Sequence, residues 1–210
     1  MRKFKFDDGS KVFFTSDTHF SHGNVMRFCH RPFRCTEEMD TAMVENWNRV
    51  VDDESIVFHL GDFAFGNLSR WEEIRSRLKG SIVLLLGNHD MRAFASGGSR
   101  FSALFEHVAQ QMLIEVEHQK IYLNHYPLMC YAGTYGHRPI WQLFGHLHLN
   151  KYYANLDSTR AEYSFPLQYD VGVDLNGFTP LSFTQIKRII DYQVENQVNV
   201  TQWLTEAPPL

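Results

Sequence analysis

The 210-residue sequence has few cysteines, no long apolar run and no strong excess of either charge. Its three cysteines, Cys29, Cys35 and Cys130, form no CxxC motif, which argues against a disulfide framework and favours a reduced compartment. The longest aliphatic run, residues 82–86, is far shorter than the roughly 20 residues of a membrane span. Since no secretory signal is visible either, we expect a soluble, cytoplasmic protein.

The net charge is only −4. This argues against a dedicated binder of nucleic acid or anionic membranes, because both partners need a basic face. It does not exclude phosphate substrates, since a bound cation can provide the missing positive charge. Low-complexity segments, internal repeats and Pro/Gly/Ser-rich linkers are also missing from the sequence. We therefore expect one domain over residues 1–210 that needs no disulfide or metal to fold.

Strand and helix patterns alternate in the first half of the chain, and strands dominate the second. Runs at 3–6 and 11–16 flank Asp8-Gly9 and predict a β-hairpin. Helices are predicted from Thr36, as N-cap, to about residue 51, and from a capping box at 69–72 to Gly80. Further strands are predicted at 55–60, 82–86, 120–124, 140–144, 168–174 and 181–183, and Thr184 caps a final helix. Residues 95–102 are expected to form a loop. Together the pattern indicates an α/β or α+β layered domain.

Five short motifs place metal-type ligands directly after predicted strands. They are Asp17-Thr18-His19, Gly61-Asp62, Gly87-Asn88-His89-Asp90, Asn124-His125 and Gly145-His146-Leu147-His148. Positions i and i+2 of an extended chain point to one face, so Asp17 and His19 can reach one cation, and His146 and His148 repeat that spacing.

The ligand inventory is two Asp, one Asn and four His. That exceeds the four ligands of a tetrahedral zinc site and fits two ions of higher coordination number that share one carboxylate. Two cations about 3.5–4 Å apart can hold both the attacking and the leaving oxygen of an in-line displacement. Nitrogen and oxygen ligands without thiolates suit Mn²⁺, Fe, Zn²⁺ or Ni²⁺.

In this order the motifs D-x-H, G-D, G-N-H-D, H and G-H-x-H resemble those of the calcineurin-like metallophosphoesterase superfamily. The resemblance extends more weakly through residues 171–183 to small bacterial and phage members. It implies a four-layer α-β-β-α sandwich with two mixed β-sheets. It also implies two divalent transition-metal ions, with Mn²⁺ as the first choice, and a hydroxide between them as nucleophile.

By position, the resemblance assigns a role to each motif residue. The first metal site would consist of Asp17, His19, Asp62 and His148. The second would consist of Asp62, Asn88, His125 and His146, with Asp62 bridging. The remaining motif residues, His89 and Asp90, would be catalytic: His89 would protonate the leaving oxygen or stabilise charge on the phosphoryl group, and Asp90 would orient its ring.

One position departs from the family pattern. Many members have the sequence G-D-x-x-D, whereas Phe65 stands here at the second acidic position. Any bond that this carboxylate makes in relatives is therefore missing. His59 lies inside a predicted strand and is expected to be a hydrogen-bonded core residue rather than a ligand.

Several residues near the motifs are candidates for substrate contacts. His22 and Asn24 directly follow the first ligand pair, with plain loop structure as the alternative. Arg27 and Arg31 could contact phosphate, because guanidinium groups match it in a bidentate manner; a solvated helix face is the alternative. His137 lies between two motifs and could reach the mouth of the site.

These features predict a metal-dependent phosphoesterase that acts on a small phosphorylated substrate, and the small relatives favour a phosphodiesterase. A nuclease for single-stranded nucleic acid is one alternative, because Arg27, Arg31 and Arg34 lie close together in the sequence, although the net charge disfavours it. A non-catalytic binding scaffold on the same fold is another alternative. The intact His89 and ligand set argue against that scaffold.

Overall fold

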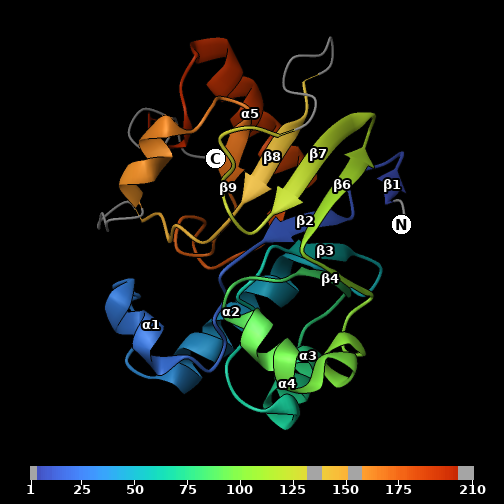
Figure 1. Ribbon diagram of the computed structural model, residues 1–210, viewed down its shortest axis with the longest axis vertical. Coiled ribbons are helices and arrows are strands. Elements are labelled where there is room, and N and C mark those ends of the chain that lie inside the picture. Colours follow the sequence, from blue (N-terminus) through green and yellow to red (C-terminus); the bar gives the residue numbers. More distant parts are fainter. Residues whose placement is uncertain (1–3, 132–138, 151–157, 203–210) are drawn as a thin grey trace.

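The computed structural model describes residues 4–131, 139–150 and 158–202. Two mixed five-stranded sheets lie face to face (Figure 1). The first sheet contains, in spatial order, β1 (Lys5–Phe6), β6 (Gln111–Val116), β7 (Gln119–Asn124), β8 (Trp141–Phe144) and β9 (Gln168–Asp170). The second contains β10 (Leu181–Ser182), β2 (Val12–Thr15), β3 (Ile56–His59), β4 (Ser81–Leu85) and β5 (His107–Ala109). Strands β7 to β9 are parallel, as are β2 to β5.

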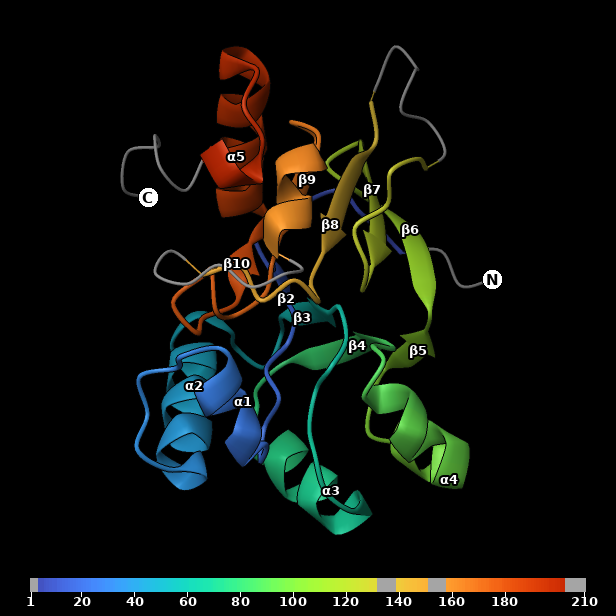
Figure 2. The same cartoon turned by 60° about the vertical axis from the view of Figure 1, so that its left-hand side comes forward.

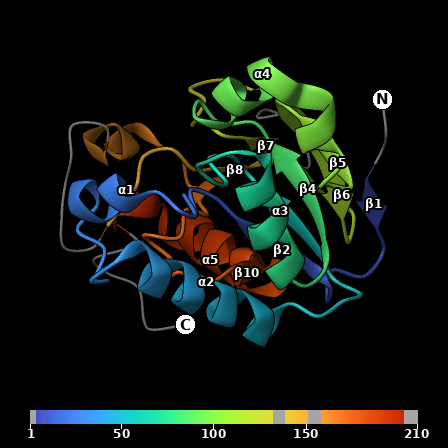
Figure 3. The ribbon, with the colours of Figure 1, turned by 90° about the horizontal axis from the view of Figure 1, so that it is seen from below.

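Helices flank both sheets. They are α1 (Gly23–Phe28), α2 (Thr36–Val50), α3 (Leu68–Arg77), α4 (Asp90–Ser102), α5 (Phe183–Asn196) and a 3₁₀ helix, η1 (Ser158–Tyr163). Helices α1 to α4 cover the outer face of the second sheet (Figure 3). Helix α5 packs on β9, β10 and β2, beside the edge strands of the two sheets (Figure 2). The expected architecture of two mixed sheets with flanking helices is confirmed.

The second sheet separates two apolar cores. Successive strand side chains point to opposite faces, so Phe14 of β2 packs between the sheets while Phe13 packs against the helices. On the helical side, Trp47 of α2 and Trp71 of α3 are fully buried. Burial of each large side chain stabilises the fold by roughly 1.5–3 kcal/mol. These cores hold the strand ends, and therefore the residues that follow them, in fixed positions.

The predicted hairpin around Asp8-Gly9 is wrong. Strand β1 pairs in parallel with β6 of the first sheet, whereas β2 pairs with β3 of the second, so the chain crosses between sheets at this turn. The Gly9 N–H donates to Glu117 at 3.0 Å. A Cβ on Gly9 would lie 2.4 Å from the ring of Phe183. Glycine is needed here for close packing between elements rather than for a hairpin turn.

Three helix starts differ from the prediction. Helix α3 begins before the predicted box, because Asn67 is its N-cap and accepts the Arg70 N–H at 3.1 Å. In α5 the N-cap is Ser182, which forms a capping box with Gln185, rather than Thr184. In α2, Thr36 is the first helical residue instead of the cap. Polar residues close to a helix start compete for the cap, and the packing of the preceding strand decides between them.

Residues 95–102, predicted as a loop, are part of α4. The helix bends at Gly97 but continues to Ser102. The rings of Phe94 and Phe101 lie 6.2 and 5.0 Å from that of Trp71. Burial against α3 thus holds a helix whose glycine and serine content disfavours one. None of the helices in the described part of the chain has the length and hydrophobicity needed to cross a membrane.

Candidate metal centre

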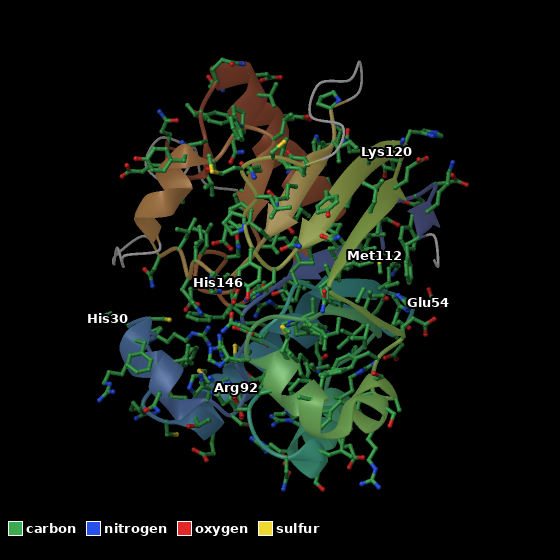
Figure 4. All side chains as sticks on the ribbon, viewed as in Figure 1. His30, Glu54, Arg92, Met112, Lys120 and His146 are labelled. Atoms are coloured by element: carbon green, nitrogen blue, oxygen red, sulfur yellow. The ribbon has the colours of Figure 1, made fainter. Side chains whose placement is uncertain are left out.

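The five motifs meet at the carboxyl ends of parallel strands from both sheets. Asp17, Asp62 and Asn88 follow β2, β3 and β4, and His125 and His146 follow β7 and β8. A parallel bridge between residues 16 and 172 joins the continuation of β2 to that of β9, so the two sets of strand ends lie side by side. Figure 4 labels His146 at the level where the sheets meet, on the side that carries α1.

The Asp62 carboxylate is the hub of the site. Its Oδ1 accepts the backbone N–H of His89 at 2.9 Å. Its Oδ2 lies 3.5 Å from Nε2 of His19, 3.6 Å from Nε2 of His125 and 3.9 Å from Nε2 of His89. These separations are too long for good hydrogen bonds, and those to His19 and His125 suit side chains that would share an ion with Asp62.

Two buried atoms beside this hub have no hydrogen-bond partner among the described residues: Oδ1 of Asp17 and Nε2 of His19. An unsatisfied buried polar atom costs about 1–3 kcal/mol, so two neighbouring ones indicate that a cation belongs between them. The ligand atoms of Asp17, His19 and His148 lie within 4.8 Å of one another, as do those of Asp17, Asp62 and His125. These two clusters are consistent with a dinuclear site that shares carboxylates.

Two of the histidines are held so that Nε2 faces the centre. The His125 Nδ1–H donates to the Leu60 carbonyl at 2.8 Å. The His148 Nδ1–H donates to Asp174 at 2.7 Å, and its Nε2 lies 3.9 Å from Asp17 Oδ1. An Nδ1–H bound to a carbonyl or carboxylate fixes the tautomer and leaves the Nε2 lone pair for a metal.

Asn88 and His146 complete the set of seven candidate ligands. Oδ1 of Asn88 lies 3.1 Å from Nε2 of His125. The ring centroid of His146 lies 5.0 Å from that of His125, and its backbone N–H donates to Asp17 Oδ2 at 2.8 Å. The structure therefore brings the seven candidate ligands of the five motifs to one place.

The backbone at the ligands is left-handed, not extended. The reasoning from i and i+2 positions in an extended chain is therefore wrong for both histidine-containing pairs. Positive φ angles between 49° and 70° occur at five of the candidate ligands: Asp17, His19, Asp62, His146 and His148. Such conformations cost roughly 1–3 kcal/mol per non-glycine residue and persist where the surrounding structure forces them, typically at functional sites.

Two motif glycines allow backbone to approach the carboxylates. A Cβ on Gly87 would lie 2.2 Å from Oδ1 of Asp62, and one on Gly145 would lie 2.2 Å from Oδ2 of Asp17. Both contacts are far inside van der Waals distance. Only glycine fits at these positions while the carboxylates stay in place.

Arg31 is buried, so the expectation that it contacts phosphate or lies on a solvated face is wrong. Its Nε and Nη2 donate to both oxygens of Asp174 at 2.8 and 2.9 Å, and its Nη atoms also donate to the Asp17 and Thr18 carbonyls. Burial alone would raise the pKa of Asp174, but Arg31 and then His148 outweigh it and lower the pKa to about 2. Sequence reasoning missed Asp174, although it ends a predicted strand as the ligands do.

The predicted orientation of the His89 ring by Asp90 is wrong, because the Asp90 carboxylate binds backbone amides. The His89 side chain is 33% exposed, and its Nε2 faces Asp62. Asp90 has a different role from the one expected: its carboxylate accepts the N–H groups of Asp62, Phe63 and Gly87 at 2.7 to 2.9 Å instead of a His89 ring nitrogen. It fixes the loops after β3 and β4. Burial and then the Asp62 charge raise the pKa of Asp90 to about 7.

Phe65, at the position that is acidic in many relatives, stacks on His22 with ring centroids 3.7 Å apart. Its centroid lies 5.0 Å from that of His89. Nδ1 of His22 lies 3.3 Å from Nδ1 of His19. Burial lowers the pKa of His22 to about 4 and that of His19 well below its usual value, which keeps both rings neutral. The apolar Phe65 ring thus lies beside the histidines of the site, at the position where many relatives have a carboxylate.

The other candidates are more peripheral. Asn24 and Arg27 are exposed on α1, and the Arg27 guanidinium lies over the ring of Phe28. His137 lies outside the described residues. His59 is buried with its Nε2 2.9 Å from the Thr18 hydroxyl, which confirms the expected core role.

Comparisons with known proteins agree with this geometry. Residues 10–185 match the family model described as calcineurin-like phosphoesterase. An uncharacterized protein of Methanocaldococcus jannaschii is 32% identical over 187 residues, which cover 86% of this chain and 92% of the relative. The gene 66 protein of Mycobacterium phage L5 is 28% identical over 144 residues, which cover 60% and 66%. The crystal structure of an Aquifex aeolicus protein of unknown function has the same fold, with a TM-score of 0.62 at 23% identity; the match covers 85% of this chain and 98% of that one.

Proposed function

The chain belongs to the calcineurin-like phosphoesterase family, and from this premise we propose that it is a dinuclear metal-dependent phosphodiesterase acting on a small organic phosphate. The observation that carries the proposal is the environment of Asp62. One carboxylate oxygen faces imidazole nitrogens from three different strand ends, and one of these nitrogens, Nε2 of His19, has no hydrogen-bond partner among the described residues, as is also true of the nearby Oδ1 of Asp17. Preference for a diester over a monoester comes from the resemblance to small bacterial and phage members.

The residues divide into two overlapping ligand sets. Asp17, His19, Asp62 and His148 would hold one divalent cation. Asp62, Asn88, His125 and His146 would hold the other. Mn²⁺ is our first choice, and Fe, Zn²⁺ and Ni²⁺ also suit nitrogen and oxygen ligands. When bound, such cations lower the pKa of water and neutralise charge on the phosphate.

The catalytic work of the chain itself falls to His89. Its ring is partly exposed, and the backbone bond to Asp62 fixes its position at the hub. In this role the imidazolium would donate a proton to the leaving alkoxide oxygen, an effect that typically contributes 10²–10⁴-fold in rate. His22 on its Phe65 support is the nearest candidate for a further substrate contact.

The nuclease alternative is weakened by the burial of Arg31. The Arg31 guanidinium is fully buried against Asp174, whereas Arg34 stays 90% exposed in a surface pair with Glu38. Arg31 therefore does not contribute to the basic groove that the closeness of the three arginines in the sequence suggested.

The test is hydrolysis of bis-p-nitrophenyl phosphate by the Mn²⁺-loaded protein. His89→Ala should lower turnover strongly while two metal ions per chain remain bound, because the variant loses the group that would stabilise charge on the phosphoryl group or protonate the leaving oxygen. His118→Ala is the matched control, because that histidine is exposed on the surface and lies outside the ligand set. Bound metal with no phosphodiester cleavage would favour the scaffold alternative, and absence of metal uptake would refute the model.

A further inference from the structure

A cavity of about 620 Å³ opens beside the metal centre. We name it the aromatic cavity, and its walls include Tyr126, Leu128, Met129, His146, Tyr163 and Gln168. It lies between the segment that follows β7 and the segment that joins η1 to β9. Its volume is within the range of about 300–1,000 Å³ that is usual for small-molecule sites.

The aromatic cavity is continuous with the metal centre. His146 belongs to both, as a wall of the cavity and a candidate ligand. The Tyr126 ring centroid lies 4.7 Å from that of His146 and 4.9 Å from that of His125, with the rings edge to face. A phosphoryl group at the metals would therefore have its organic substituent directed to this cavity or to open solvent.

The inner wall of the cavity is rigid. Gln142 and Gln168 are buried and face each other on β8 and β9. The Gln142 amide donates to the Tyr126 carbonyl at 3.0 Å and accepts the Leu128 N–H at 3.1 Å. The Gln168 amide donates to the Leu128 carbonyl at 2.9 Å. These bonds hold the 126–128 segment in place before any ligand arrives, which reduces the entropy cost of binding.

The outer wall is apolar yet exposed. The side chains of Met129 and Tyr163 are 89% and 78% exposed. Large apolar side chains that surround a concave site are typical of ligand-binding surfaces. None of the described residues that line the cavity is Lys, Arg, Asp or Glu. Two tyrosine rings and a thioether suit a flat π-system, whereas the described lining offers no charged side chain of these four types to bind a second charged group.

We infer that the aromatic cavity receives the organic group of the substrate and that this group contains a flat aromatic ring. This inference rests on the proposed phosphoesterase function, because the metals would hold the phosphate end. It deepens that function by naming the substrate class: phosphoesters of an aromatic or heteroaromatic alcohol or nucleoside-like group.

The experiment compares two phosphonates that share one head group. Protein loaded with diamagnetic Zn²⁺ and labelled at methionine methyl groups is titrated with phenylphosphonate or methylphosphonate and followed by NMR. We expect phenylphosphonate alone to shift the Met129 methyl signal, which is assigned with Met129→Leu. The signal of Met112, buried between the sheets and labelled far from His146 in Figure 4, should stay in place.

Substitutions in the walls of the aromatic cavity are then tested by measuring phosphonate affinity with titration calorimetry. Tyr163→Ala and Met129→Ser should each weaken phenylphosphonate binding by about tenfold, the effect of one lost aromatic contact, and leave methylphosphonate binding unchanged. Both side chains are exposed, so their loss should not affect folding. Phe28→Ala, which removes an exposed ring that does not line the cavity, is the matched control and should change neither affinity.

The outcomes separate the two proposals. Binding of both phosphonates with no shift of Met129, or with no effect of either wall variant, overturns the inference and leaves the proposed function standing. Failure of both phosphonates to bind the Zn²⁺-loaded protein overturns the proposed function, and the inference with it.

Discussion

The sharpest prediction concerns Asp174, the buried carboxylate that connects Arg31 to His148. It accepts two bonds from Arg31, at 2.8 and 2.9 Å, and one from His148 at 2.7 Å. Asp174→Asn keeps the size of the side chain and one acceptor oxygen but removes the charge. The variant therefore removes the charge and, because the amide NH₂ cannot accept, at least one of the three accepted hydrogen bonds.

Asp174→Asn should lower both the stability of the fold and its affinity for metal. Breaking a buried ion pair typically lowers the free energy of unfolding by about 3–5 kcal/mol. Because Arg31 retains its bonds to the Asp17 and Thr18 carbonyls, we expect a loss of about 3 kcal/mol. For a chain of this length that lowers the melting temperature by roughly 6–12 °C. Loss of the carboxylate behind His148 should also weaken metal binding by about 10–100-fold, the usual effect of removing such a partner.

The assay pairs thermal unfolding with competition for Zn²⁺ against a chromogenic chelator. Ile74→Ala is the control, because it removes a fully buried side chain of α3 in the core on the helical side, costs about 2–5 kcal/mol and changes no candidate ligand. Both variants should melt earlier, but only Asp174→Asn should lose metal affinity. Wild-type metal affinity in Asp174→Asn would refute the view that this carboxylate holds His148 in its ligating orientation.

Two further predictions concern Gly145, which packs against Asp17, and the buried carboxyl of Asp170 at the end of β9. Gly145→Ala should abolish metal binding by displacing Asp17. The control Gly98→Ala on α4, whose Cβ would meet only the Phe94 ring at 3.9 Å, should bind metal normally and gain up to about 1 kcal/mol of stability in chemical denaturation. Normal metal binding by Gly145→Ala would contradict the close-contact argument. Burial and then the Asp17 charge raise the pKa of Asp170 to about 8, so the native carboxyl keeps its proton between about pH 4 and 8 while the unfolded chain loses it. The metal-free protein should therefore lose stability as pH rises through this window, and Asp170→Asn should flatten the profile; an unchanged slope in unfolding free energy against pH would refute it.

The candidate ligands could be identified from the sequence because each motif is short and continuous along the chain. A strand, a glycine and a polar residue follow one another within a few positions, as at Gly61-Asp62 and Gly87-Asn88. Parallel strands bring their carboxyl ends to one edge, so residues with this pattern converge without any need to know which strands pair. The main strands and helices were predicted for a similar reason, since hydrophobic periodicity is a short-range signal.

Features that depend on pairing were not predictable in this way. Asp8-Gly9 is a good hairpin sequence, but β1 finds its partner in β6, far along the chain. The 95–102 segment has a loop composition, yet Trp71 on α3 stabilises it as helix. In both cases a tertiary contact is stronger than a local preference worth at most about 1 kcal/mol per residue.

The amino-acid sequence alone determined which side chains can bind metal and in what order they occur, because that information lies within each motif. Tertiary structure alone decided how they are held: the left-handed backbone at Asp17, the amides bound by Asp90 and the burial of Arg31 against Asp174. Arg31 and Asp174 are 143 positions apart, and no local pattern marks such a pair. Their contact exists only because the fold brings the segment after α1 and the segment after β9 to the same buried place, where a buried charge needs an opposite charge beside it.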